Sequence, residues 1–120
     1  MTQTHEKFKI FRGAAEAGSF NSVFNQLETF ANLPNHAAKS IGVEYLEDSK
    51  ELIVSLGYTA VEGQGNSVKV EVKPIGNLSE SNEALETKIG EAAHNLNNVI
   101  CHALYITETD DLSMIFMCDI

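Results

Sequence analysis

Apolar residues in the first third of the chain recur at helical spacing. Between residues 4 and 17, Phe8, Phe11 and Ala15 follow one another at offsets of three and four, and Gly18 supplies a stop. This pattern predicts a first helix. Ser19 is then placed to cap a second helix. Its apolar stripe consists of Phe20, Val23, Phe24, Leu27, Phe30 and Ala31, and it ends at residues 32–34.

From residue 41 the period changes from helical to two, which predicts strands. Large apolar residues recur at every second position over residues 41–45 and again over 52–58. With Asp48 and Ser49 as the turn, one register places all the large apolar residues on one face and pairs Glu47 with Lys50. The predicted pairs are Tyr45 with Leu52, Val43 with Val54 and Ile41 with Leu56.

The second half of the sequence predicts one more strand, a helix and a final hairpin. Residues 61–67 form a loop, residues 67–73 alternate as a strand with one wet face, and Pro74 ends that strand as it would an edge strand. Ser79 or Ser81 opens the helix, and two strands follow at 99–107 and 112–119. The apolar positions of the helix are Leu85, Ile89, Ala92, Ala93 and Leu96, and Asn95, Asn97 and Asn98 close it.

These elements predict a single α+β domain spanning residues 1–120. The expected element order is α-α-β-β-β-α-β-β, with helices on one face of a five-stranded antiparallel sheet made of a three-strand meander and a C-terminal hairpin. In element order alone the chain resembles the type III secretion chaperones, which place a helix before three strands and another before the last pair. It departs from them by an extra N-terminal helix and by ending on a strand. The resemblance implies a small acidic homodimer.

Composition and charge narrow the class of protein. With 43% hydrophobic residues and two prolines, the 120-residue chain has the composition of a folded globule. A formal net charge of −9 argues against nucleic-acid binding, which needs a concentrated basic surface. The charge is uneven: residues 1–40 are slightly basic, whereas residues 79–120 carry eight acidic residues and one lysine. We expect a cytoplasmic protein with no membrane partner, because no signal core or membrane-length apolar run is present.

Cys101, His102 and Cys118 form the one grouping with catalytic character. In one register of the last hairpin Cys101 opposes Cys118. In the favoured register His102 opposes Cys118 within an apolar face that holds Ile100, Leu104, Ile106, Met114, Phe116 and Ile120. A thiol beside an imidazole can be a nucleophile or half of a metal site, but two buried, inert core residues are the expected reading. No paired cysteine or histidine spacing is present, so neither a metal nor a cofactor is predicted.

Both alternating sets of the last strand are apolar, so something must cover the second face of the sheet. This face would hold Ala103, Tyr105, Ile115 and Met117. Either the N-terminal helices or a second copy of the chain covers it, and we favour a homodimer with these residues at the interface. The first functional hypothesis is a non-enzymatic binding or adaptor module for a peptide or protein. The alternative is a small-molecule-binding domain or enzyme with a pocket between helices and sheet, using His102 and Cys118.

Overall fold

The computed structural model describes residues 6–15, 22–63 and 67–120. Within these residues it contains two helices and six strands. Their order and bounds are β1 (Lys7–Ala14), α1 (Val23–Ala31), β2 (His36–Leu46), β3 (Glu51–Ala60), β4 (Val68–Asn77), α2 (Asn82–Ala93), β5 (Asn97–Ile106) and β6 (Asp111–Asp119).

The strands form two separate antiparallel sheets, not the single five-stranded sheet that the sequence predicts. Sheet A has the order β1-β3-β2 and sheet B the order β4-β6-β5. The predicted three-strand meander is wrong at its third strand, because β4 pairs with β6 in sheet B and not with the β2–β3 hairpin in sheet A. The predicted α-α start is also wrong, because the first described element is a strand.

The segment predicted as the first helix is β1, which pairs with β3 along its whole length. Its apolar residues satisfy two periods at once: Phe8 and Phe11 are three apart, as in a helix, whereas Phe8 and Ile10 alternate with lysines, as in a strand. Pairing with the open edge of β3 satisfies the backbone groups on one side of β1 and buries Phe11 beside Val54. Tertiary pairing therefore overrides the local helical pattern.

Helix α1 matches the predicted second helix but begins later. Ser22 caps it, with Oγ accepting a hydrogen bond from the Phe24 N–H at 3.1 Å. The predicted cap Ser19 and the apolar Phe20 lie outside the described residues. Val23 and Leu27 are fully buried, so the predicted apolar stripe is the packed face of the helix.

The first hairpin is confirmed in both strands and register. Tyr45 pairs with Leu52, Val43 with Val54 and Ile41 with Leu56, around a turn at residues 47–50. Lys50 adopts a positive φ of 58°. Its predicted partner was Glu47, but its ammonium pairs with Glu108 at the tip of the other hairpin. The tips of the two sheets are thereby linked.

Strand β4 lies at the edge of sheet B, as predicted, but it continues past Pro74 to Asn77 through an irregularity between Pro74 and Gly76. Two side chains of the α1 region bind the outer edge of β4. The Asn32 side chain accepts from the Val68 N–H at 2.8 Å and donates to the Val68 carbonyl at 2.9 Å. Glu28 accepts from the Val70 N–H at 3.1 Å. The edge is therefore paired with polar side chains in place of a further strand.

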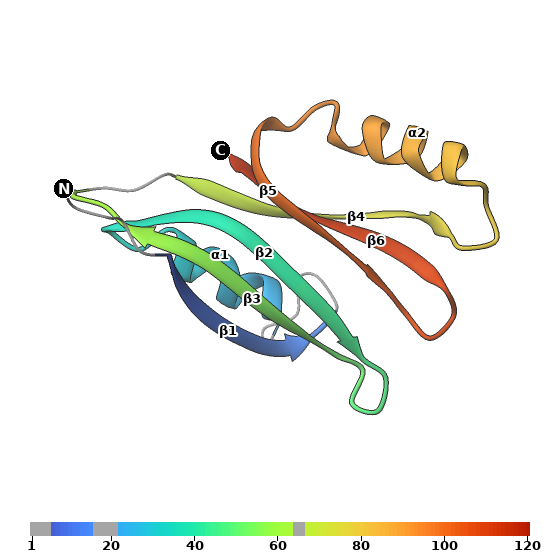
Figure 1. The fold of residues 1–120 in the computed structure, drawn as a ribbon, viewed down its shortest axis with the longest axis horizontal. Helices are drawn as coiled ribbons and strands as arrows, with labels where there is room; N and C mark the ends of the chain where they lie inside the picture. Colours follow the sequence, from blue (N-terminus) through green and yellow to red (C-terminus); the bar gives the residue numbers. More distant parts are fainter. Residues whose placement is uncertain (1–5, 16–21, 64–66) are drawn as a thin grey trace.

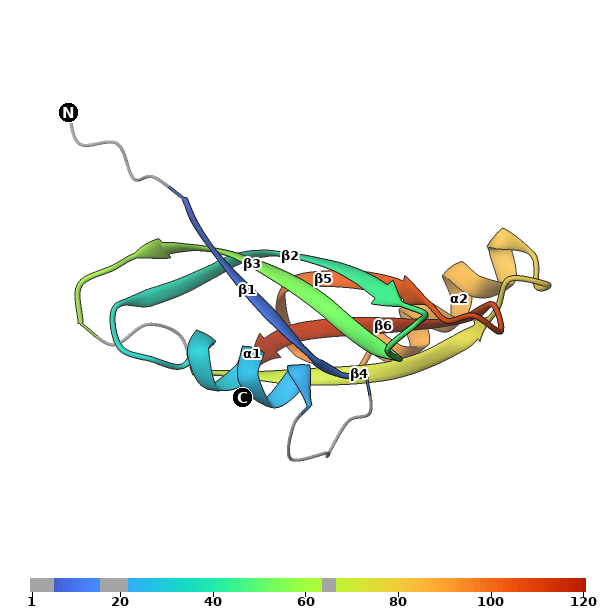
Figure 2. The ribbon, with the colours of Figure 1, turned by 90° about the horizontal axis from the view of Figure 1, so that it is seen from below.

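The elements stack in layers (Figure 1): sheet A lies below sheet B, and α2 lies above sheet B. Figure 2 shows α1 alongside β4, where it closes one side of the space between the sheets. The main core fills that space, between the α1 side of sheet A and the face of sheet B that carries Ile115 and Met117. A smaller core, including Leu85, Met114 and Phe116, lies between α2 and the opposite face of sheet B.

The two halves of the chain repeat one unit. Each runs strand, helix, strand, strand, and in each the last strand lies between the other two. Each helix contains Leu-Glu-Thr, at Leu27 in α1 and at Leu85 in α2, and in both the leucine is buried. Sheet B thus packs its helix-free face onto the helix-bearing face of sheet A.

Candidate functional site

The structure does not bring the predicted Cys/His pair together. His102 pairs with Phe116, whereas Cys118 pairs with Val99 on β5 and Lys69 on β4. Both registers considered for the last hairpin are therefore wrong, because the strands pair around a turn at residues 107–111 that places Ile106 opposite Leu112; the register of β5 shifts again on either side of Val99. Part of the predicted grouping is nevertheless found: Leu104, Ile106, Met114 and Phe116 share a face, whereas Ile100 packs against the main core and Ile120 is exposed.

The two cysteines lie on opposite faces of sheet B. Cys101 belongs to the core between the sheets, and burial raises the pKa of its thiol to about 11. Cys118 follows Met117 on β6, is fully buried, and has its thiol pKa raised mainly by burial. Because the thiolate is the nucleophile, neither site favours reactivity at neutral pH. His102, expected in the core, is exposed.

Other candidate groups lie apart from one another. Gly63, in the predicted loop at 61–67, has a positive φ of 78°, while residues 64–66 of that loop lie outside the described residues. His36 stacks on Phe30 with ring centroids 4.5 Å apart. Across residues 6–15, 22–63 and 67–120, no three His, Cys, Asp or Glu side chains gather as metal ligands. In the same ranges no helix has the length and apolarity needed to cross a membrane.

The residues predicted at a dimer interface lie inside the chain. Tyr105, Ile115 and Met117 belong to the core between the sheets, and Ala103 on the same face is half-buried. The second apolar face of the last strands is thus covered by sheet A and α1 of the same chain. Self-association stays a prediction, but these residues face the chain's own first half.

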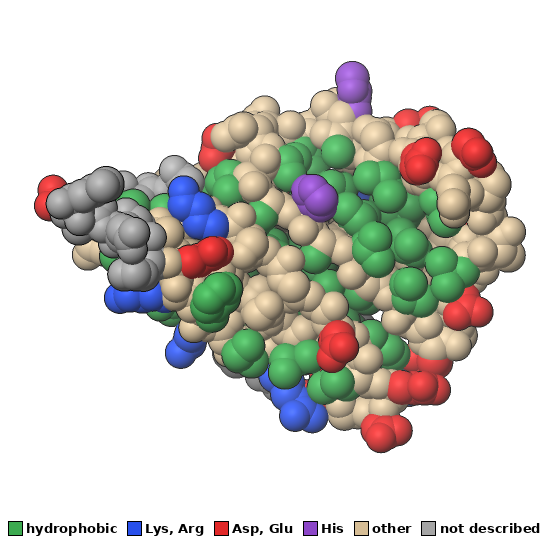
Figure 3. Space-filling view, viewed as in Figure 1, with side chains coloured by type: hydrophobic (Ala, Val, Ile, Leu, Met, Phe, Trp, Pro, Cys, Tyr) green, Lys and Arg blue, Asp and Glu red, His purple; other side chains and the backbone are tan. Residues whose placement is uncertain are grey.

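An apolar surface remains open on the other face of sheet B, beside α2. Helix α2 packs over β4, and its one buried residue is Leu85. It leaves the β5 side of that face uncovered, where Leu104 is 48% and Ile106 36% exposed. Figure 3 shows hydrophobic side chains gathered where β5 and α2 lie. We call this the α2–β5 surface, formed by Leu104, Ile106 and the half-buried Ile89, Ala93 and Leu96.

Sequence reasoning placed Leu104 and Ile106 in the core and missed this surface. The signal available was the narrow apolar stripe of α2, whose sequence NEALETKIGEAA offers few large apolar side chains. Such a stripe cannot cover the whole of this sheet face, on which β5 and β6 carry Leu104, Ile106, Met114 and Phe116 while β4 carries Lys69, Glu71 and Lys73.

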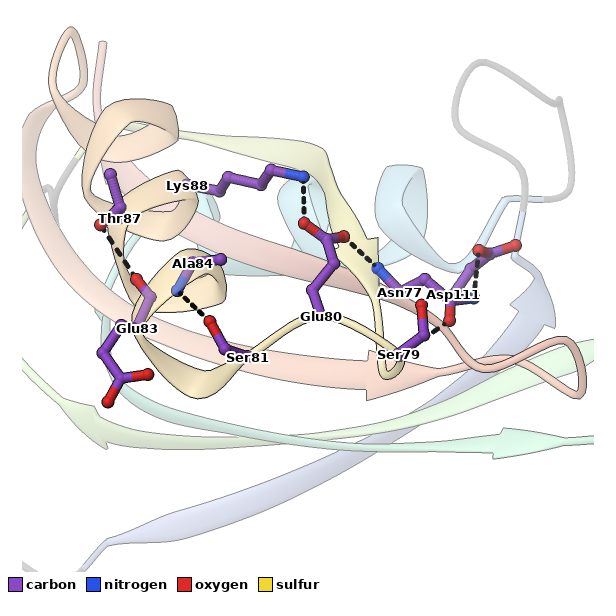
Figure 4. Close-up of polar contacts among 9 residues, drawn as sticks. All are labelled: Asn77, Ser79, Glu80, Ser81, Glu83, Ala84, Thr87, Lys88 and Asp111. Atoms are coloured by element: carbon purple, nitrogen blue, oxygen red, sulfur yellow. Dashed lines mark hydrogen bonds and ion pairs between the residues drawn. The ribbon is translucent and has the colours of Figure 1, made fainter.

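A polar network at the β4–α2 junction sets where α2 lies (Figure 4). Glu80 accepts from the Asn77 N–H at 2.8 Å and pairs with the Lys88 ammonium, and Ser81 caps the helix by accepting from the Ala84 N–H. The ion pair with Lys88 and then the Asn77 N–H lower the pKa of Glu80. The Asn77 side chain also donates to Asp111 on β6 at 3.2 Å, as Figure 4 shows. These bonds hold the start of α2 against β4 and β6 and leave β5 open.

Comparison with known proteins finds no matching family model, no similar curated protein and no similar solved structure. The likeness in element order to type III secretion chaperones therefore gains no support. The α2–β5 surface is the candidate functional site of this chain.

Proposed function

We propose that this protein is a non-enzymatic binding module that takes a polypeptide partner on the α2–β5 surface. The observation that carries the proposal is the exposure of Leu104 and Ile106 on the face that also holds the buried Met114 and Phe116. Large apolar side chains clustered on a surface favour association with another apolar surface, because burying them removes that area from water.

The apolar and acidic side chains of the α2–β5 surface indicate what kind of partner it would bind. Helix α2, which borders it, carries Glu83, Glu86 and Glu91 against the single Lys88, and Lys88 already pairs with Glu80. A partner with an apolar face and basic flanking residues fits this combination, since charge complementarity steers and orients association. We place this activity in the cytoplasm, which suits two free, buried cysteines.

The enzyme alternative has less in its favour. His102 is paired with Phe116 and Cys118 with Val99, so the two are not cross-strand neighbours. Burial raises the pKa of the Cys101 and Cys118 thiols and so favours their protonated form. The interior between the sheets is filled with apolar side chains. A hollow of about 730 Å³ near β1 opens at the surface, and the charged Arg12 and Glu51 in its lining pair with each other.

A photo-crosslinking amino acid at His102, an exposed position on the same sheet face, tests the proposal. The matched control carries the same group at Asp48, in the exposed turn of the first hairpin. We expect the crosslinker at position 102 to form polypeptide adducts, and these adducts to disappear in a chain that also carries Leu104→Asp. The crosslinker at position 48 should not form the same adducts. Equal adducts at both positions, or adducts unaffected by Leu104→Asp, would contradict the proposal.

A further inference from the structure

The contact between the two halves of this chain shows what fits on the helix-bearing face of its repeated unit. In sheet A, α1 covers the β1 side of that face, and sheet B covers the β2 side with β5 running beside β2. The β2 residues Ile41, Val43 and Tyr45 are half-buried there, packed against the main core. In sheet B the corresponding β5 residues are Leu104 and Ile106, which the described residues leave 48% and 36% exposed.

The surface that would fit on sheet B also exists in the chain. Within the molecule, the helix-free face of sheet B covers the helix-bearing face of sheet A. One row of cross-strand neighbours on this covering face is Val72–Ile115–Ala103. The helix-free face of sheet A has the equivalent row Ile10–Ser55–Gly42. In both rows the first strand contributes a large apolar residue and the third a small one.

This helix-free face of sheet A is open. Phe8 is 67% exposed and Ile10 is 58% exposed, and both are apolar. Beside Ile10 lies a shallow hollow of about 270 Å³, lined also by Gly42, Ile53 and Ser55. Protruding side chains from an apposed surface would fit there, because Gly42 and Ser55 leave little bulk above the sheet.

Charge and edge contacts fit the same arrangement. Inside the molecule, Glu28 of α1 binds the outer edge of β4 through the Val70 N–H. Glu86 has the same place in the Leu-Glu-Thr of α2, and its side chain is exposed. Strand β1, the counterpart of β4, is a basic sheet edge: Arg12 lies on the same face as Phe8 and Ile10, while Lys7 and Lys9 alternate with them on the α1 side of the strand. Acidic α2 and basic β1 are therefore complementary.

We propose that copies of this chain stack head to tail. The helix-free face and β1 edge of sheet A in one copy dock on the α2–β5 surface of the next, as sheet B docks on sheet A within a copy. This inference rests on the proposed function and names a second copy of the chain as the partner. Two different surfaces meet at each contact, so the assembly grows beyond a dimer unless it closes into a ring.

Two substitutions, each destroying one of the two surfaces, test the proposal. Ile10→Asp places a charge on the sheet A face and Leu104→Asp places one on the α2–β5 surface, both at exposed positions. By sedimentation velocity, the unmodified chain should grow in mass with concentration past the dimer or reach a fixed ring. Each variant alone should be monomeric, because every contact needs both surfaces.

The mixture of the two variants gives the decisive result. Ile10→Asp keeps an intact α2–β5 surface and Leu104→Asp keeps an intact sheet A face, so an equimolar mixture should form one-to-one dimers and stop there. A chain carrying both substitutions is the matched control and should pair with neither. Phe8→Ser and Ile106→Ser form a second pair should either aspartate variant fail to fold.

Several outcomes would overturn the stacking. A monomeric unmodified chain at all concentrations would do so, and so would a Leu104→Asp variant that still dimerises, because that would indicate a symmetric contact elsewhere. Adducts from position 102 to a different polypeptide, with the chain itself monomeric, would refute stacking and leave the proposed function standing. Self-association that Leu104→Asp does not affect, together with no polypeptide adduct from position 102, would refute both.

Discussion

At the scale of single residues, burial decides the chemistry of the cysteines. Cys101 faces the core between the sheets and Cys118 the opposite side of sheet B, so no disulfide joins them. Desolvation raises the pKa of both thiols, to about 11 for Cys101. The neutral thiol is favoured because an apolar surrounding disfavours the thiolate.

The folded protein should therefore react only slowly with Ellman's reagent at neutral pH. His102→Ala should leave that rate unchanged, since His102 opposes Phe116 and lies on neither cysteine's ladder position. Reaction in urea supplies the control, because unfolding exposes both thiols. A fast thiol in the folded protein that slows in the His102→Ala variant would contradict this and restore the enzyme hypothesis.

At the scale of elements, side chains at the end of α1 take the place of a strand along β4. The Asn32 amide makes both an accepted and a donated bond with Val68, and Val68 is 1% exposed. Without Asn32, a buried N–H and carbonyl at the sheet edge lose their partners. Leaving buried backbone groups unpaired is costly.

We expect Asn32→Ala to lower the free energy of unfolding by about 1–3 kcal/mol, measured by urea denaturation. Asn95→Ala, at an exposed asparagine after α2, is the matched control and should change it little. Equal stability of the two variants would show that the Asn32 bonds contribute nothing net.

The tips of the two hairpins are joined by Lys50, Glu108 and Tyr45. The bond from Lys50, followed by that from Tyr45, lowers the pKa of Glu108 from 4.5 to about 2. A carboxyl group with a depressed pKa in the folded state stabilises the fold above its unfolded pKa. That stabilisation is present above about pH 4.5 and is lost as the pH falls towards 2.

Glu108→Gln should therefore flatten the acid side of the stability profile between pH 4.5 and 2. The measurement is the urea midpoint as a function of pH, compared with Asp110→Asn in the same turn as control. An unchanged slope in Glu108→Gln would mean that exposure to solvent screens the Lys50 pair.

At the scale of the whole molecule, the two halves share one core. Leu27, Leu56, Ile115 and Met117 from both halves are fully buried in it. A charge placed there is taken out of water without a partner, which disfavours folding. The same charge on the open side of sheet B stays hydrated.

Met117→Asp should accordingly lower the free energy of unfolding by about 3 kcal/mol or more in urea denaturation. Leu104→Asp on the adjacent strand, 48% exposed, is the control and should change it far less. If Met117→Asp left stability intact and altered only the mass in solution, this face would be an interface between copies after all.

Some local features of the fold could be predicted in full from the sequence, and others only in part or not at all. The first hairpin follows from alternation alone, since only one register gathers Ile41, Val43 and Tyr45 opposite Leu52, Val54 and Leu56. The strands of the last hairpin were predicted but not its register, because both alternating sets of β6 are apolar and do not select one position for the turn. The α2–β5 surface was missed because its leucine and isoleucine have the same spacing as core residues.

Where the apolar pattern fits only one period, the sequence by itself determined the helix or strand and which of its side chains share a face. These properties depend on neighbours a few residues apart. Only the tertiary structure decided that residues 7–14 form a strand, since Phe8, Ile10 and Phe11 satisfy both periods until β3 offers an edge. It also decided that β4 leaves β3 for β6, across more than thirty residues. Pairings at such distances depend on the total burial that each arrangement achieves, and no local pattern encodes that sum.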